Sequence, residues 1–235
     1  MRMLRHAIRK IKYQLKFLSV KKKLDFSYLS EAKTNQELKK LMDFYGSDKG
    51  GKNNQHNFAQ YYSEIFYNKK NNIKNFLEIG LGSNNIDVPS NMGVGGKPLA
   101  SLRAWRDYFK NANIYGGDID KEILKNEDRI KTHYVDQTNP SSIKIMFENF
   151  GVKKFDVILE DGLHEFNANI CFFEHSIDFL SNDGVYIVED IYYKDQEKFI
   201  KYFQKTPYNF SIIDIYHKSN IANNSLLVVR KNHGL

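Results

Sequence analysis

Short apolar runs alternate with longer helical patterns from residue 75 onward. Four runs are rich in the apolar residues of buried strands: FLEIG, IYGGDID, FDVILED and VYIVED. Apolar residues recur at helical spacing in four further stretches, near residues 99–109, 141–150, 168–180 and 196–203. This alternation predicts a parallel sheet covered by helices on both faces, with right-handed crossovers between its strands.

The pattern changes after Pro207. Two β-rich runs, residues 210–217 and 225–230, are separated by an Asn-rich turn that leaves no room for a helix. They predict an antiparallel hairpin beside a parallel core of five strands. We therefore expect an α/β fold with a doubly wound, mostly parallel seven-stranded sheet and a Rossmann-like outline.

The first 45 residues have a different character. Residues 1–24 carry nine Lys or Arg and no acid, and residues 8–18 hold apolar positions at helical spacing. Such a helix packs on its own domain or on a second subunit of a homo-oligomer, or it rests on anionic lipid or a partner protein. We expect a basic, helical N-terminal extension over residues 1–45 and one domain over residues 46–235. The polar, glycine-containing run Gly46–His56 predicts a surface loop.

Length and composition exclude several classes of protein. A chain of 235 residues can bury a large core, and its only cysteine, Cys171, excludes an intrachain disulfide and agrees with a reducing compartment. No stretch has the apolar length of a membrane span or a secretory signal, so we expect a cytoplasmic protein whose membrane contact is at most peripheral. The net charge is +7, and removing the nine cations of residues 1–24 leaves −2, which argues against nucleic acid binding by the domain.

Two of the predicted strands end in a pair of acids. Glu160 and Asp161 follow DVIL, Glu189 and Asp190 follow VYIV, and His164 comes three residues after the first pair. The carboxyl ends of parallel strands meet at one edge of the sheet, where ligands bind. Carboxylates gathered there favour a cation, and Mg²⁺ prefers such oxygen ligands while keeping positions for water or substrate. The alternative is that these acids cap the helices that follow.

A glycine turn follows the first strand of this series, in the run FLEIGLG. Its glycines, Gly80 and Gly82, allow backbone amides to approach a ligand closely. A dinucleotide site would need a third glycine at position 85, but this residue is Asn. It would also need an acid about 20 residues further on, where this chain has the loop PSNMGVGGKP instead. Glu78 before the turn and Asp118 after the next strand match S-adenosylmethionine better, because this ligand has a cationic amino group and a ribose with two hydroxyl donors. The alternative for Asp118 is a turn residue in GGDID.

An ordered set of motifs between Gly46 and Ile191 carries a family resemblance. The motifs are GSDKG, HNFAQYY, FLEIGLG, SLRAWRDYFKNANIYGGDID, VDQTNP, EDGLH and IVEDI. In this order they resemble the metal-dependent sugar O-methyltransferases of the macrocin and mycinamicin type, and related bacterial methyltransferases of surface-glycan clusters. The resemblance implies the class I methyltransferase fold.

The resemblance also implies roles for individual residues. The implied S-adenosylmethionine contacts are Glu78, Gly80, Gly82 and Asp118, with Asp136 and Gln137 beside the adenine and Tyr62 and the SDKG loop over the ligand. The implied Mg²⁺ ligands are Asp161, Glu189 and Asp190, and the implied general base is His164. The family commonly has Asp-Asp-Gly-Ser-His where this chain has EDGLH, so the hydroxyl group expected at Leu163 is missing.

These implications converge on one predicted function, the Mg²⁺-assisted methylation of a sugar hydroxyl. The acceptor would belong to a glycan, such as a capsule or surface polysaccharide, or to a glycosylated natural product. A metal would orient the hydroxyl and His164 would take its proton. Two other functions stay open: a nucleotide-dependent oxidoreductase, and a noncatalytic scaffold recruited through the basic helix.

Overall fold

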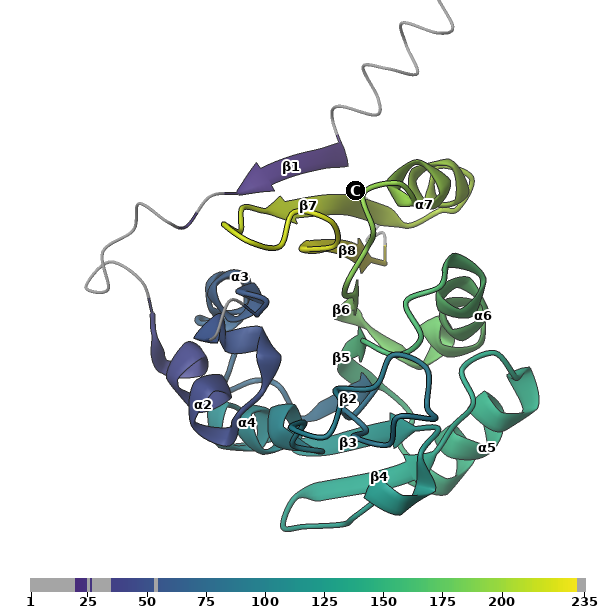
Figure 1. Cartoon of the computed structure of the whole chain (residues 1–235). Helices are drawn as coiled ribbons and strands as arrows, with labels where there is room; N and C mark the ends of the chain where they lie inside the picture. The colour runs from purple at the N-terminus through teal and green to yellow at the C-terminus, as the bar shows by residue number, and fades with distance from the viewer. Residues whose placement is uncertain (1–19, 25, 27–34, 53–54, 232–235) are drawn as a thin grey trace, which may run out of the picture.

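The computed structural model describes residues 20–24, 26, 35–52 and 55–231. These residues contain an eight-stranded sheet in the order β1-β7-β8-β6-β5-β2-β3-β4 (Figure 1). The strands are β1 (Lys21–Leu24), β2 (Asn75–Ile79), β3 (Asn113–Asp118), β4 (Ile130–Tyr134), β5 (Phe155–Glu160), β6 (Leu180–Val188), β7 (Asn209–Ile215) and β8 (Ser225–Arg230). Strands β2 to β6 are parallel, and β8 is antiparallel to both β6 and β7. The predicted parallel core of five strands and the C-terminal hairpin are therefore confirmed.

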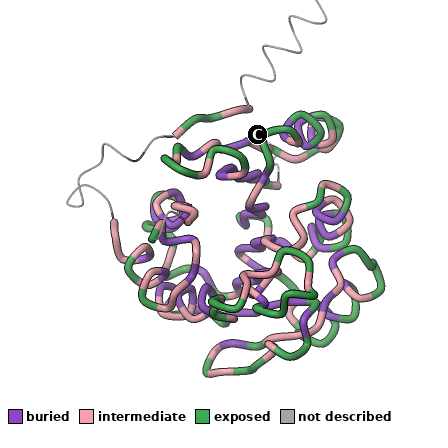
Figure 2. Tube along the Cα trace, viewed as in Figure 1, coloured by how far each residue is buried: buried purple, intermediate pink, exposed green. Residues whose placement is uncertain are grey.

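Helices cover both faces of this sheet, as the pattern predicts. The helices are α2 (Glu37–Tyr45), α3 (Phe58–Phe66), α4 (Ala100–Tyr108), α5 (Pro140–Phe150), α6 (Phe166–Ser176) and α7 (Gln196–Phe203), with short 3₁₀ turns η2 (Asp48–Gly50), η4 (Lys121–Ile123) and η5 (Ile177–Phe179). Helices α2, α3 and α4 contribute to one apolar cluster, and α5, α6 and α7 to another. Strand side chains alternate between the two, since Phe76 joins the first and Leu77 the second. Figure 2 shows the central strands, which separate the two clusters, as largely buried.

The sheet has one strand more than the predicted seven. Strand β1 comes from the basic N-terminal segment and pairs in parallel with β7. Its Lys21 Nζ lies 3.1 Å from Asp214 Oδ2 and donates to Gln196 Oε1 at 2.6 Å. The run KKKL has no apolar alternation, so the sequence pattern gave no sign of a strand there. The predicted basic helix over residues 8–18 lies outside the described residues.

No helix in the described ranges has both the length and the apolarity that a bilayer crossing requires.

Trp105 anchors the first apolar cluster. Its helical spacing with Leu102 and Phe109 predicts core packing, and its side chain is fully buried against the rings of Phe76 and Phe109. Replacing Trp105 with alanine should lower the free energy of unfolding by about 3 to 5 kcal/mol, because a large cavity remains. Chemical denaturation followed by circular dichroism measures this. Val94→Ala, at a side chain that is 88% exposed, should change stability by less than about 0.5 kcal/mol.

Candidate active site

A cavity of about 460 Å³ opens where the parallel strands end. Most residues predicted for the site line it: Gly80, Gly82, Asp118, Asp136, Gln137, Asp161, His164 and Asp190. The other three predicted residues, Tyr62, Glu78 and Glu189, are not in the lining and are almost fully buried behind it. The structure therefore separates residues that can touch a ligand directly from residues that support the wall.

Gly80 is required by its surroundings. Its φ of +88° is in the left-handed region, and a Cβ atom added there would lie 1.9 Å from the backbone oxygen of Asp161. Its N–H donates to the carbonyl of Gly117 at 2.9 Å. The glycine turn thus lets β2 pass close beside the loop after β5, and this close approach forms one wall of the cavity.

Asp118 organises the same wall from the end of β3. Its carboxylate accepts hydrogen bonds from the N–H groups of Leu81 at 2.6 Å and Asp120 at 2.8 Å, which is the turn role that GGDID allows. Burial raises the pKa of Asp118 despite these bonds. The next residue, Ile119, lines the cavity with 47% of its surface exposed. The sequence analysis did not name this apolar side chain, although its position next to Asp118 could have indicated that it lies in the site.

Gln137 braces the loop that carries the acids. Its amide donates to Glu160 Oε1 at 3.0 Å, and its own oxygen accepts from the N–H of Leu163 at 2.8 Å. Glu160 also accepts hydrogen bonds from Asn169 and from the N–H of Gly162. Burial raises the pKa of Glu160 to about 7. The first acid of this doublet is therefore a structural support under the loop.

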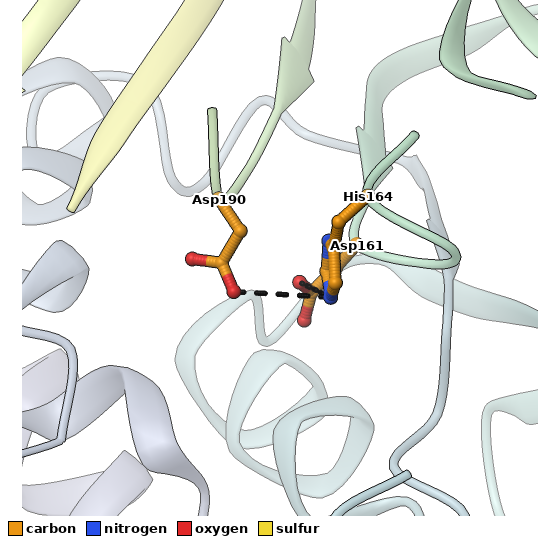
Figure 3. Close-up of side chains that lie close together, drawn as sticks. All are labelled: Asp161, His164 and Asp190. Carbon is orange, nitrogen blue, oxygen red and sulfur yellow. Dashed lines mark ion pairs between the residues drawn. The ribbon is translucent and has the colours of Figure 1, made fainter. Parts of the chain in front are cut away.

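Asp161, His164 and Asp190 all line the cavity, and their side chains point toward one another (Figure 3). His164 Nε2 lies 3.9 Å from Asp161 Oδ1 and 3.8 Å from Asp190 Oδ2. Each residue offers one ligand atom, and the three atoms lie within 4.8 Å of one another. This arrangement fits a divalent cation: the two carboxylates suit Mg²⁺, and a ligand set that included the imidazole would suit a first-row transition metal.

The backbone at this cluster is strained. His164 and Asp190 adopt φ values of 58° and 55°, which are uncommon for residues other than glycine. Such conformations persist where the surrounding structure enforces them, and they concentrate at functional sites. His164 Nδ1 is also buried without a hydrogen-bond partner. Burial lowers the pKa of His164, so its imidazole is neutral near pH 7.

The second acid doublet divides as the first does, with its first acid in the interior and its second at the cavity. The register pairs Glu160 with Val188, so Glu189 comes opposite Asp161, and its N–H donates to the carbonyl of Glu160 at 2.9 Å. The Glu189 side chain accepts a 2.5 Å hydrogen bond from Tyr62 and lies 2.8 Å from Lys49 Nζ. Burial, with Asp161, raises the pKa of Asp190 well above its usual value. Asp190 thus faces the cavity, whereas Glu189 faces α3.

The sequence analysis named Lys49 only as part of the SDKG loop over the ligand and gave it no role of its own. The loop Gly46–His56 was predicted to lie on the surface, but Lys49 is only 2% exposed and its ammonium contacts Asp161 and Glu189. The prediction was wrong for this part of the loop because the run has no apolar residue to signal burial. His56, from the end of the same loop, places Nδ1 3.3 Å from Asp190 Oδ1.

A second cavity of about 620 Å³ adjoins the first. Both are lined by Ser90, Leu163, His164 and Tyr192, and the second extends along the start of α6 and the loop before α7. His164 therefore lies between two hollows, one beside the glycine turn and one open to solvent. This arrangement can bring two molecules together at one imidazole.

Known proteins of similar sequence are O-methyltransferases, although no family model matches the chain. The chain is 31% identical over 147 residues to 8-demethyl-8-alpha-L-rhamnosyl tetracenomycin-C 2'-O-methyltransferase of Streptomyces olivaceus, which covers 63% of this chain and 35% of that protein. It is 30% identical over 157 residues to demethylmacrocin O-methyltransferase of Streptomyces fradiae, covering 66% and 36% respectively. The chain thus spans about a third of the length of the curated relatives that it matches.

Solved structures show the same fold. MycE methyltransferase from the mycinamycin biosynthetic pathway, in complex with Mg and SAH, superimposes with a TM-score of 0.63 at 23% identity. The match covers 84% of this chain and 55% of that one. The fold is therefore that of a methyltransferase. Within that class, the chain resembles the sugar O-methyltransferases of the macrocin, mycinamicin and tetracenomycin types, which confirms the resemblance drawn from the motifs.

Proposed function

We propose that the chain is an S-adenosylmethionine-dependent, Mg²⁺-assisted O-methyltransferase acting on a sugar hydroxyl. The acceptor belongs to a glycan, such as a capsule or surface polysaccharide, or to a glycosylated natural product. The observation that carries the proposal is the position of His164, with Asp161 and Asp190, between two adjoining cavities. The named activities of the curated relatives support it.

The first cavity is the proposed cofactor site. Its glycine turn brings backbone amides of Gly80 and Gly82 to the ligand, and Asp118 lies beside them as the acceptor for ribose hydroxyls. Ile119 offers an apolar face for the adenine, while Asp136 and Gln137 lie along the same wall. Glu78 and Tyr62 support this wall from the interior. Burial raises the pKa of Glu78 to about 7, and the Tyr62 hydroxyl donates a hydrogen bond to Glu189.

Asp161, Glu189 and Asp190 are the proposed ligands of Mg²⁺. When bound, S-adenosylmethionine supplies an activated methyl group and Mg²⁺ supplies charge stabilisation to the acceptor oxygen. Asp161 and Asp190 already face the common space, and Glu189 lies opposite Asp161 with its oxygens bonded to Tyr62 and Lys49. The carboxylates thus come from the ends of two neighbouring strands.

His164 is the proposed general base. Its imidazole is neutral near pH 7 and Nε2 faces the cavity, so it can take the proton of an acceptor hydroxyl as that oxygen bonds to the methyl group. The second cavity holds the acceptor, with Tyr192 and Phe166 available to pack against a sugar ring. We assign this chemistry to the domain over residues 46–235.

A binding and turnover experiment tests the proposal. Calorimetry should detect S-adenosylhomocysteine binding and no NADH binding by the full-length protein. Formation of S-adenosylhomocysteine should then be measured with a panel of free, nucleotide-linked and lipid-linked sugars. Turnover should stop in EDTA and return with Mg²⁺. Binding of NADH without S-adenosylhomocysteine would favour an oxidoreductase, and full turnover in EDTA would exclude the metal-assisted reaction.

A further inference from the structure

Lys49 is a buried cation surrounded by carboxylates. Its Nζ contacts Asp161, lies 2.8 Å from Glu189 Oε2, and lies 3.6 Å from both Asp48 Oδ1 and Glu78 Oε1. Apart from Asp48, these acids come from the ends of three neighbouring strands, β2, β5 and β6. A single ammonium thus joins the edge of the sheet to the loop before α3.

The loop is shaped to deliver this ammonium. Ser47 Oγ accepts from the N–H of Lys49 at the start of η2, and Gly51 closes the turn with a φ of +89°. Gly50 packs so tightly that an added Cβ would lie 2.2 Å from Asp43 Oδ1 of α2. This tight contact with α2 holds the loop in the position that directs Lys49 at the acids.

Burying an ammonium has a large cost unless opposite charges and hydrogen bonds compensate for lost water. Here four carboxylates surround the ammonium, those of Asp48, Glu78, Asp161 and Glu189. An ammonium has three N–H donors, so these acids offer more oxygens than Lys49 can bond, and a divalent ion with six or more ligands would use them more fully. Asp161 and Glu189, the two acids closest to Lys49, are also two of the three proposed Mg²⁺ ligands.

We propose that Lys49 is a resident cation that holds Asp161 and Glu189 in position and is displaced from them when Mg²⁺ binds. This inference rests on the metal site of the proposed function. Lys49 is a positioning residue in this scheme, because it acts through the two acids. Its neighbour Asp48 lines the cofactor cavity, so displacement of the ammonium would move the loop that borders the cofactor. Metal loading and cofactor binding are thereby coupled.

Calorimetric titration with MgCl₂ in the presence of S-adenosylhomocysteine tests the exchange. Lys49→Met removes the charge and keeps a long side chain, so Mg²⁺ should bind at least tenfold more tightly than in the wild type. Lys144→Met is the matched control, because Lys144 pairs with Glu148 at 3.7 Å on the exposed face of α5 and lines neither cavity, so this variant should bind Mg²⁺ as the wild type does. Unchanged or weaker Mg²⁺ binding by folded Lys49→Met would overturn the inference.

Two further measurements separate the inference from the proposed function. In the wild type, hydrogen exchange over residues 47–51 should become faster when Mg²⁺ is added. Unchanged exchange in the metal-bound protein would overturn the inference. This measurement does not depend on whether Lys49→Met folds. Asp190→Asn should weaken Mg²⁺ binding at least tenfold, because Asp190 is a proposed ligand that does not touch Lys49. If the wild type does not bind Mg²⁺, the metal site of the proposed function is contradicted. If Lys49→Met does not bind Mg²⁺ either, the inference about Lys49 is overturned as well.

Discussion

Replacing His164 with asparagine is expected to lower the rate of methyl transfer by a factor of about 10² to 10⁴. An amide cannot accept the hydroxyl proton, whereas the neutral imidazole can. Asparagine is chosen because it tolerates the left-handed backbone that His164 adopts, so the loop after β5 keeps its shape. Steady-state rates with saturating S-adenosylmethionine and an active sugar acceptor measure the effect.

Two controls make this result specific. Affinity for S-adenosylhomocysteine and the melting temperature should stay near wild-type values in His164→Asn. His175→Ala, on the exposed side of α6, should keep full activity, since His175 lines neither cavity and its Nδ1 hydrogen-bonds to the carbonyl of Cys171 at 2.8 Å. Retention of wild-type turnover by folded His164→Asn would show that another group removes the proton.

Replacing Gly80 with alanine should weaken cofactor binding and destabilise the fold. The new methyl group would overlap the backbone oxygen of Asp161, and the residue would keep a φ of +88°. Backbone strain and overpacking together predict a loss of about 3 kcal/mol in the free energy of unfolding. S-adenosylhomocysteine affinity should fall more than about tenfold, which corresponds to 1.4 kcal/mol, because the turn and the loop after β5 must separate. Calorimetry and denaturant titration measure the two effects.

Gly151→Ala separates strain from steric overlap. Gly151 ends α5 with a φ of +66°, and an added Cβ would meet nothing within 4 Å. It should lose only about 1 to 2 kcal/mol and keep its full affinity for S-adenosylhomocysteine. Equal behaviour of the two variants would mean that the close approach at Gly80 does not shape the cavity.

The strands with strong apolar runs were predictable from sequence. The runs that became β2, β3, β5 and β6 are buried on both faces of the sheet. Because both faces are buried, these strands are nearly continuous apolar runs, which the sequence shows directly. Strand β1 was not predictable, because KKKL stands at the margin of the sheet with lysines that need no apolar partner. Strand β4, IKTHY, was part of the expected strand count but was not located, since half of it is polar and only partly buried.

The candidate site was predictable in part for a geometric reason. Acids at strand ends gather at one edge of a parallel sheet, and their presence there could be inferred from position alone. Adjacent residues on a strand point to opposite sides, so each doublet divides between the cavity and the interior. Which member faces which side depends on the pairing of β5 with β6, and the approach of Lys49 depends on a contact between residues 112 positions apart. Neither is encoded in local sequence.

Strand β1 also protects the sheet against aggregation. It is four residues long, it stands outermost in the described strand order, and Lys22 and Lys23 are exposed on it. An open strand can recruit a strand from a neighbouring molecule, and short length and repeated positive charge oppose that recruitment. These two exposed lysines therefore discourage this chain from stacking on copies of itself.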